Sequence, residues 1–470
     1  MKNILKEIET KYPVDTILVN GEQVWPYLRI AYHFRHIENA VSEYGEKQLR
    51  PETSLFQRPK TAFKMLGYSF YGLGNWFGKY TYIALSNTGE RRDVNGKYLN
   101  KLLDPFIDEL GRDRVLYVET PAHVMYPVRK GYTKRVVFRH LPELSAVILT
   151  KLLRKKCIIQ NKWVLDSIQK EYDLEINDVS RVKYFKAQKI VFNLIFRKIK
   201  PKAILLSCYY GHNQAAIKAA RDIGIAVIEF QHGTISKEDP AYNVNIELDK
   251  TFFPDYLLVF GRRELETFDN SRFIEPQNVR PIGSFYLEYI KKNYQLERNL
   301  VELLKEYKAS VGVTLEWTMQ KRVIEFIRKA ANLDRAILYL LIPRWPKERY
   351  YLALGLPDNV MIVTDKNFYE LMMYVDFHST VYSTCALEAP SLGVQNILIN
   401  IDGLSNRYYG KVLTDSGVTR YVETPEEFVK TVNTFERLSR DTISKFNEDI
   451  FAINYTNNIQ RLLQNPPFCE

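Results

Sequence analysis

The hydrophobic positions of this chain fall into two alternating kinds of segment. Short runs of apolar and β-branched residues are followed by longer segments in which apolar residues recur at helical spacing. The clearest case lies within residues 203–230, which contain the run AILLSCYY, the helical segment NQAAIKAARDIG and the run IAVIEF. A strand, a helix and a second strand with short connections form a βαβ unit, and we expect its strands to be parallel.

The same alternation occurs in both halves of the chain. In the first half, further strands are predicted at RVLYVET (114–120) and DYLLVFG (255–261). In the second half, SVGVTLEW (310–317) and AILYLLIPRW (336–345) begin a new series of strands. Residues 40–100 are rich in aromatic and turn-forming residues and give no clear prediction.

The pattern predicts an α/β protein with two doubly wound, Rossmann-like domains that face a central cleft. We assign residues 1–285 to the first domain and residues 309–470 to the second, which ends in helical patterns without a strand. The polar helical segment 286–308 is expected to connect them. A second domain of roughly 150 residues has an ordinary size.

His232 is the first candidate for chemistry. The run IAVIEF leads directly into Gln231, His232 and Gly233. Loops that leave the carboxyl ends of parallel strands line the ligand crevice of an open sheet, and glycine gives the backbone freedom to place the imidazole at its rim. A neutral imidazole can take a proton from a hydroxyl. The same residues would also suit a histidine that caps the next turn or satisfies a buried carbonyl.

Further candidates lie earlier on the same side of the chain. The short run DTILVN (15–20) is a predicted strand, and Glu22 and Arg29 follow it in a loop and an aromatic helix. If this strand joins the parallel sheet, Glu22 and Arg29 approach the crevice. An amphipathic helix packed on the sheet through its aromatic residues explains them equally well. His212, after the run 203–210, is a third candidate.

The second half contains a stretch typical of a phosphate site, VDFHSTVYSTCALEAPSLG. Ser383 and Thr384 stand at the predicted start of a helix, and Glu388 lies about one turn inside it. Free N–H groups at a helix start bind phosphate oxygens, and an acidic residue can accept hydrogen bonds from ribose hydroxyls. Arg344, at a neighbouring strand end, could neutralise a diphosphate. Outside this fold, Ser-Thr before a helix is only a cap.

Charge narrows the choice of partners without deciding it. The chain has 66 basic and 55 acidic residues, a net charge of +11, which suits a polyanion, an anionic membrane or a phosphorylated substrate. Residues 129–156 contain several basic residues and lead into a basic amphipathic helix. Such a helix can bind an anionic membrane peripherally, or it can be a solvated helix with one buried face. No nucleic-acid recognition motif is present, so we expect no nucleic-acid partner.

Cysteine and histidine give no sign of a metal site or a disulfide. The four cysteines have no paired spacing, and the seven histidines form no recognisable ligand cluster. The N-terminal stretch mixes charges with apolar residues, unlike a signal peptide, and no apolar run is long enough to cross a bilayer. We expect a cytoplasmic protein without a bound metal, located at the inner face of the membrane if the basic stretch binds lipid.

Two motifs resemble those of a known family. The HGT that closes one strand and the later ST-x₃-EA-x₃-G resemble GT-B glycosyltransferases, above all the bacterial enzymes that build capsules, lipopolysaccharide and teichoic acids. QHGTISK is similar to the HGT-x-x-K element of polyol-phosphate polymerases, in which the histidine is the proposed base. YSTCALEAPSLGVQNILI resembles the donor motif of Kdo and sialic acid transferases. The likeness covers residues 200–410, with two departures: Pro390 inside the helix, and IPRW where the family often has histidine before the basic residue.

The resemblance implies a glycosyltransferase. A nucleotide sugar, bound as a substrate rather than a cofactor, would occupy residues 309–470, and a surface-polysaccharide or lipid-linked glycan acceptor would occupy residues 1–285. His232 would deprotonate the acceptor hydroxyl. Ser383, Thr384 and backbone N–H groups would hold the leaving phosphate, and Arg344 would offset its charge. No DxD-like pair is placed to bind a metal, so the reaction is expected to be metal-independent.

Two other functions remain open at this point. Nucleotide-sugar 2-epimerases share this architecture but need no acceptor groove, and a non-catalytic nucleotide- or polysaccharide-binding protein could use the same scaffold. The charge of +11 and the aromatic-rich N-terminal region favour a transferase over an epimerase.

Overall fold

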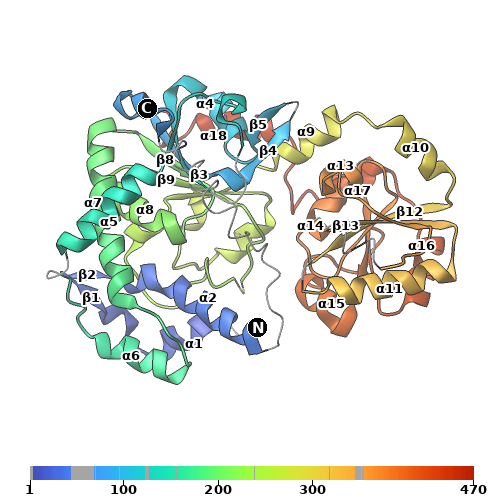
Figure 1. Cartoon of the computed structure of the whole chain (residues 1–470), viewed down its shortest axis with the longest axis horizontal. Coiled ribbons are helices and arrows are strands. Elements are labelled where there is room, and N and C mark those ends of the chain that lie inside the picture. The colour runs from blue at the N-terminus through green and yellow to red at the C-terminus, as the bar shows by residue number, and fades with distance from the viewer. Residues whose placement is uncertain are drawn as a thin grey trace. The chain divides into compact units, whose positions relative to one another are not determined.

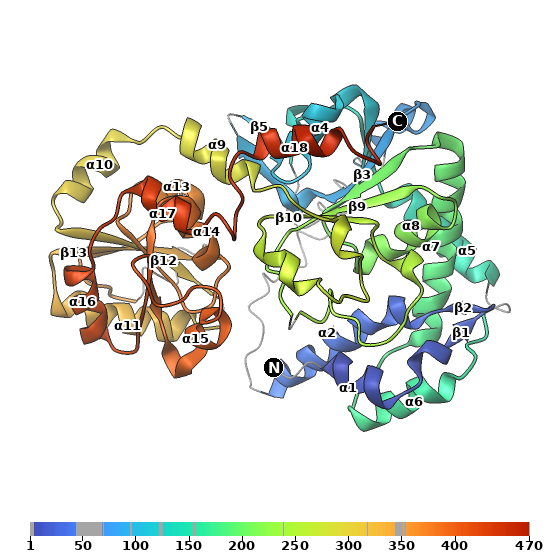
Figure 2. The same cartoon turned by 180° about the vertical axis from the view of Figure 1, so that it is seen from behind.

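The chain forms two compact units (Figures 1 and 2). A computed structural model describes residues 4–43, 68, 70–94, 96–121, 126–153, 157–237, 239–316, 318–343, 351 and 354–469. The first unit comprises Met1–Ile282 together with Thr456–Glu470, and the second comprises Gly283–Tyr455. The predicted second domain extended to residue 470, whereas its last residues belong to the first unit in the structure.

A seven-stranded parallel sheet forms the centre of the first unit. Its order is β11-β10-β9-β8-β3-β6-β7. The strands are β3 (Tyr82–Asn87), β6 (Val115–Thr120), β7 (Val136–Phe138), β8 (Ala203–Leu206), β9 (Ala226–Phe230), β10 (Tyr256–Val259) and β11 (Val279–Pro281). The predicted βαβ unit is present, since β8 and β9 are parallel neighbours and helix α8 joins them.

Helices and two small hairpins complete the first unit. The helices are α1 (Ile4–Lys11), α2 (Trp25–Glu43), α4 (Asp104–Leu110), α5 (His140–Leu152), α6 (Lys162–Glu171), α7 (Asp178–Ile199), α8 (Gln214–Arg221) and α18 (Tyr455–Leu463), whose first residue belongs to the second unit. The antiparallel hairpins are β1 (Leu18–Val19) with β2 (Glu22–Gln23), and β4 (Arg91–Val94) with β5 (Lys97–Asn100).

A six-stranded parallel sheet forms the second unit, in the order β14-β13-β12-β15-β16-β17. The strands are β12 (Ala309–Leu315), β13 (Ile337–Pro343), β14 (Val360–Ile362), β15 (Phe377–Ser379), β16 (Gln395–Ile399) and β17 (Thr419–Val422). The helices are α9 (Phe285–Asn293), α10 (Arg298–Lys305), α11 (Gln320–Leu333), α13 (Phe368–Met372), α14 (Cys385–Ser391), α15 (Leu404–Tyr409), α16 (Pro425–Thr434) and α17 (Arg440–Phe446). Segment 286–308 thus forms most of α9 and all of α10.

Burial on both faces explains why the strands were recognisable in the sequence. All seven residues of β12 and all four of β8 are buried. A parallel strand covered on both faces is a continuous apolar run rather than an alternating one, because neither face meets water. The predicted pair of doubly wound α/β domains is therefore confirmed.

The last helix completes the core of the first unit. Ile459 of α18 is fully buried, and Phe468 packs edge-on against Phe106 with ring centroids 5.2 Å apart. Phe468 also contacts Tyr82 of β3. Within the described ranges, no helix has both the length and the apolar character needed to cross a bilayer.

Candidate functional site

His232 lies at the carboxyl end of β9, beside the loop that follows β8. Its ring is exposed to solvent, and its Nε2 is 3.4 Å from the Tyr210 hydroxyl. The imidazole also forms a hydrogen bond with the backbone of Ser207. Ser207 and Tyr210 both follow β8, so two neighbouring strand ends position this side chain at the edge of the sheet where ligands of such folds bind.

The surroundings of His232 keep its ring neutral. Although solvent reaches the ring, much of it is enclosed by protein, and this desolvation lowers the pKa of His232 from its usual 6.5. The hydrogen bond to Ser207 raises the pKa and offsets part of the effect. At pH 7 the imidazole therefore has a lone pair that can accept a proton.

Arg29 holds the loop that follows His232 through hydrogen bonds. Its guanidinium is fully buried, and its Nε is 2.8 Å from Oε1 of Glu9. It donates hydrogen bonds to the carbonyls of Pro240, at 2.8 Å, and Asn243, at 2.6 Å. Arg29 was expected to approach the crevice if the strand before it joined the parallel sheet. That condition is not met, because the segment forms the separate β1–β2 hairpin. Glu9 was not identified from the sequence.

The candidacy of Glu22 depended on the same condition. It lies on β2, outside the parallel sheet, and its carboxylate pairs with Lys189 at 2.5 Å. Lys189 also pairs with Asp222 at 2.6 Å. Glu22 also lies 3.9 Å from Lys218, so its ion pairs connect β2 to α7 and α8.

His212 lies just after β8, at the same edge of the first sheet as His232. It belongs to the 3-10 helix Gly211–Asn213 after β8, and its side chain is exposed. Its backbone carbonyl accepts a hydrogen bond from the buried Arg139 guanidinium. The loop that carries His212 is therefore fixed, which keeps it as an acceptor-side candidate.

Three carboxyl groups near His232 have raised pKa values. Desolvation by burial is the largest cause in each case, and it raises the pKa of Glu229 to about 8, of Glu264 to about 7 and of Asp239 to about 6. Oε1 of Glu229 accepts hydrogen bonds from the Tyr209 N–H at 3.0 Å and the Tyr242 hydroxyl at 2.8 Å. Glu229 and Glu264 were not identified from the sequence, because strand and turn patterns carry no information on burial of a single acid.

Glu229→Gln is expected to flatten the dependence of stability on pH. The carboxyl titrates near 4.5 when unfolded and near 8 when folded, so between these values the folded protein binds the extra proton. Stability then decreases as pH rises towards 8. Melting temperatures from roughly pH 6 to pH 9 should fall in the wild type and fall less in Glu229→Gln. Glu275→Gln, at an exposed position, is the control, and equal slopes for all three proteins would contradict the prediction.

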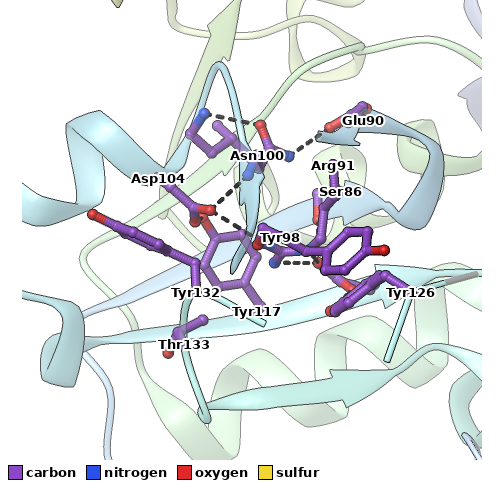
Figure 3. A network of polar contacts seen from close by, with 12 residues as sticks. Ser86, Glu90, Arg91, Tyr98, Asn100, Asp104, Tyr117, Tyr126, Tyr132 and Thr133 are labelled. Carbon is purple, nitrogen blue, oxygen red and sulfur yellow. Dashed lines mark hydrogen bonds and ion pairs between the residues drawn. The ribbon is translucent and has the colours of Figure 1, made fainter. Parts of the chain in front are cut away.

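A buried ionic network lies at the ends of β3 and β6 (Figure 3). The Arg91 guanidinium is fully buried and lies 3.1 Å from Asp104 and 2.6 Å from Glu119. Asp104 also accepts a hydrogen bond from the Asn100 N–H at 2.6 Å. Burial raises the pKa of Asp104 to about 6, and Arg91 opposes that shift. The network fixes the β4–β5 hairpin and α4 against the sheet.

The hairpin also positions a buried carboxyl beside the loop that contains Ser207. Glu90 accepts hydrogen bonds from Asn100 at 2.8 Å and from the Ser207 hydroxyl at 2.5 Å. Burial raises the pKa of Glu90. The ionic network is thus connected through Asn100 and Glu90 to Ser207, whose backbone forms a hydrogen bond with the His232 ring.

In the second unit, Ser383 and Thr384 stand at the start of α14, as expected. Ser383 Oγ accepts a long hydrogen bond, 3.4 Å, from the Cys385 N–H, and Thr384 is exposed and makes no hydrogen bond to the first turn. Glu388 lies in that first turn, and its Oε1 accepts a hydrogen bond from the Tyr369 hydroxyl at 2.9 Å. Arg344 lies outside the described residues.

Glu316 is a further acidic residue at this edge, and it was not identified from the sequence. It follows β12 and is buried, and its Oε1 accepts hydrogen bonds from Thr380, at 2.5 Å, and from the Tyr382 N–H, at 3.0 Å. Its Oε2 is buried without a donor among the described residues. A buried carboxylate oxygen without a donor can accept a hydrogen bond from a ligand hydroxyl.

His378 belongs to the interior of the second sheet. Its Nδ1 is 2.8 Å from Asn396 and its Nε2 is 3.0 Å from Thr314, and burial lowers its pKa to about 4. Across the described ranges, no group of three or more acidic, histidine or cysteine side chains is arranged to hold a metal ion.

Comparison with solved structures shows which known fold the chain resembles. The chain is similar to CalG4, the calicheamicin glycosyltransferase, with a TM-score of 0.50 and 12% identity over 82% of this chain and 98% of that one. Two further similar structures are a UDP-GlcNAc 2-epimerase from Methanocaldococcus jannaschii (TM-score 0.49, 13% identity, 82% and 99% coverage) and the wall teichoic acid polymerase TagF (0.46, 12%, 93% and 98%). No protein-family model matches the sequence, and neither does the sequence of any curated protein. At such identities the likeness shows a fold, and that fold is GT-B-like, with two Rossmann-like domains.

Proposed function

We propose that the protein is a glycosyltransferase that moves a sugar from a nucleotide-activated donor to a surface-polysaccharide or lipid-linked glycan acceptor. The observation that carries the proposal is the accessible His232 imidazole at the carboxyl end of β9, whose pKa is lowered. A neutral imidazole at this edge of a parallel sheet is suited to general-base catalysis on a bound hydroxyl. The likeness to CalG4 concerns the fold alone.

In the proposed reaction, His232 takes the proton of the acceptor hydroxyl as the oxygen attacks the anomeric carbon of the donor. The bond from the anomeric carbon to the phosphate oxygen breaks, and the nucleotide leaves with that phosphate. Tyr210 would orient the acceptor beside the ring. The motif with Ser383, Thr384 and Glu388 supports a donor site in the second unit, and Arg344 would offset the charge of the leaving group.

Incubation with a panel of nucleotide sugars and glycan acceptors tests the proposal. Acceptor-dependent release of the nucleotide, with a glycosylated product, is the expected result. Conversion of the donor to its 2-epimer without an acceptor would replace the transferase with an epimerase. Binding without turnover of any donor would replace it with a non-catalytic binding protein.

Thr384→Ala is expected to weaken nucleotide binding by about 1–3 kcal/mol, because a hydrogen bond to a charged phosphate is lost. The Thr384 hydroxyl is exposed and makes no bond to the helix, so the variant should keep its melting temperature. Calorimetry measures the affinity. Thr414→Ala removes another exposed hydroxyl of the second unit and should bind normally. Wild-type affinity in Thr384→Ala would move the donor site away from α14.

A further inference from the structure

Helix α5 exposes four large apolar side chains to solvent. Leu144, Val147, Ile148 and Leu152 are 58%, 45%, 56% and 73% exposed, whereas the buried residue at the centre of the helix is Ala146. The four exposed residues stand at positions i, i+3, i+4 and i+8, so they share one face. A helix of a globular protein usually buries such a stripe against its own core.

The neighbouring helix adds to this surface. Helix α7 packs against α5, and its C-terminal half exposes Ile190 (41%) and Leu194 (65%). The two helices lie together at one outer edge of the first unit, on the left in Figure 1 and on the right in Figure 2. We call the six exposed residues of α5 and α7 the apolar face.

Basic residues accompany the apolar face. The exposed charged residues of α5 and of residues 190–200 are Lys151, Arg197, Lys198 and Lys200. The acidic residue of these two segments, Glu143, is partly covered and lies 3.6 Å from Arg139. Lys198 is also 4.2 Å from the ring centroid of Phe77, a side chain that is 77% exposed. The surface thus combines aliphatic side chains with an excess of positive charge.

We propose that the apolar face docks on the surface of an anionic lipid bilayer. Helix α5 would lie in the interface plane, with its aliphatic side chains among the upper acyl chains and its lysine near the headgroups. The excess of positive charge along α5 and residues 190–200 favours anionic lipid over a second copy of this chain, whose own face would repel it. This inference does not depend on the proposed transferase activity.

The residues proposed to contact the bilayer differ from those expected from the sequence. From the sequence, the basic run within 129–156 was expected to bind the membrane electrostatically. In the structure, Arg139 is fully buried and Arg135 pairs with Asp113 at 2.9 Å. These two charges already have partners in the protein, whereas Arg129, Lys130 and Lys134 remain exposed. In the proposed contact, the aliphatic stripe of α5 therefore supplies the anchors and the exposed basic residues add attraction to anionic headgroups.

Co-sedimentation with vesicles tests the docking. The wild-type protein should bind vesicles of phosphatidylcholine mixed with phosphatidylglycerol more strongly than vesicles of phosphatidylcholine alone. Leu144→Glu/Ile148→Glu should lower the partition coefficient by at least about tenfold, because two anchors become anionic. Leu333→Glu changes a leucine that is 53% exposed on α11 and should bind like the wild type. Melting temperatures measured on the same preparations confirm that each variant is folded.

A salt series separates the aliphatic contact from a purely electrostatic one. Wild-type binding should weaken as salt screens the lysines, yet a measurable part should remain above physiological ionic strength. Equal binding by the wild type and the double variant, or no wild-type binding to anionic vesicles, would overturn the proposal. So would a lipid-free dimer that the double variant converts to a monomer, because the face would then be covered by a second copy.

Discussion

His232→Asn is expected to lower the turnover rate by about 10²- to 10⁴-fold, the range typical of losing a general base. The asparagine side chain fits an exposed position and can keep a hydrogen bond, but it cannot accept the acceptor proton. The melting temperature and the nucleotide affinity should therefore stay close to those of the wild type. The turnover rate, the melting temperature and the nucleotide affinity (by calorimetry) are measured on one preparation.

The pH profile gives an independent readout of the same role. A protonated imidazole cannot act as a base, so the wild-type rate should fall as pH decreases through the pKa of His232. Because desolvation lowers that pKa, the fall should be centred below pH 6.5. This acid limb should be missing from the residual activity of His232→Asn, and His36→Asn, a substitution on α2, should behave like the wild type. A folded His232→Asn protein with near-normal turnover would contradict the assignment and direct attention to Asp239.

Arg91→Met is expected to reduce the free energy of unfolding of the first unit by about 3–5 kcal/mol, the usual cost of breaking a buried ion pair. Burial alone would lower the pKa of Arg91, but its attraction to Glu119 and Asp104 more than compensates and keeps it charged. Without the guanidinium, two buried carboxyl groups lose their counter-charge. Denaturant unfolding measures the loss.

Two further variants identify the cause of the Arg91 effect. Arg92→Met changes the next residue, which is exposed, and should alter stability by no more than about 0.5 kcal/mol. Arg91→Met combined with Asp104→Asn and Glu119→Gln removes all three charges and should recover part of the loss, because an uncharged network leaves no unpaired ion. A single variant as stable as the wild type would show that the network contributes little.

Buried strands and short connections made much of the fold predictable. The run IAVIEF is apolar because β9 is covered on both faces, and the short loops around α8 force β8 and β9 to be parallel neighbours. The same local sequence pattern also predicted that His232 lies at a strand end. The strand order of either sheet was not predictable, because it depends on which distant strands meet.

The residues that support the candidate site could not be predicted from the sequence, for a related reason. Arg91, Asp104 and Glu119 meet only after β3 and β6 have paired, and none of them stands in a periodic pattern. Arg29 was recognised as a candidate, but its contacts were not predictable, because Glu9 and Pro240 lie far from each other in the sequence. Such partners become visible only when the tertiary contacts are known.

The packing of α18 bears on how the chain folds during synthesis. Ile459 is fully buried and Phe468 packs against the buried Phe106, although the whole second unit, Gly283–Tyr455, is translated before them. Domains generally fold as the chain emerges from the ribosome. The second unit can therefore reach its native state while the first still exposes part of its core. If a ribosome stalled near residue 455, the released chain would contain a complete second unit. Its first unit, although translated earlier, would lack α18 and remain incompletely folded.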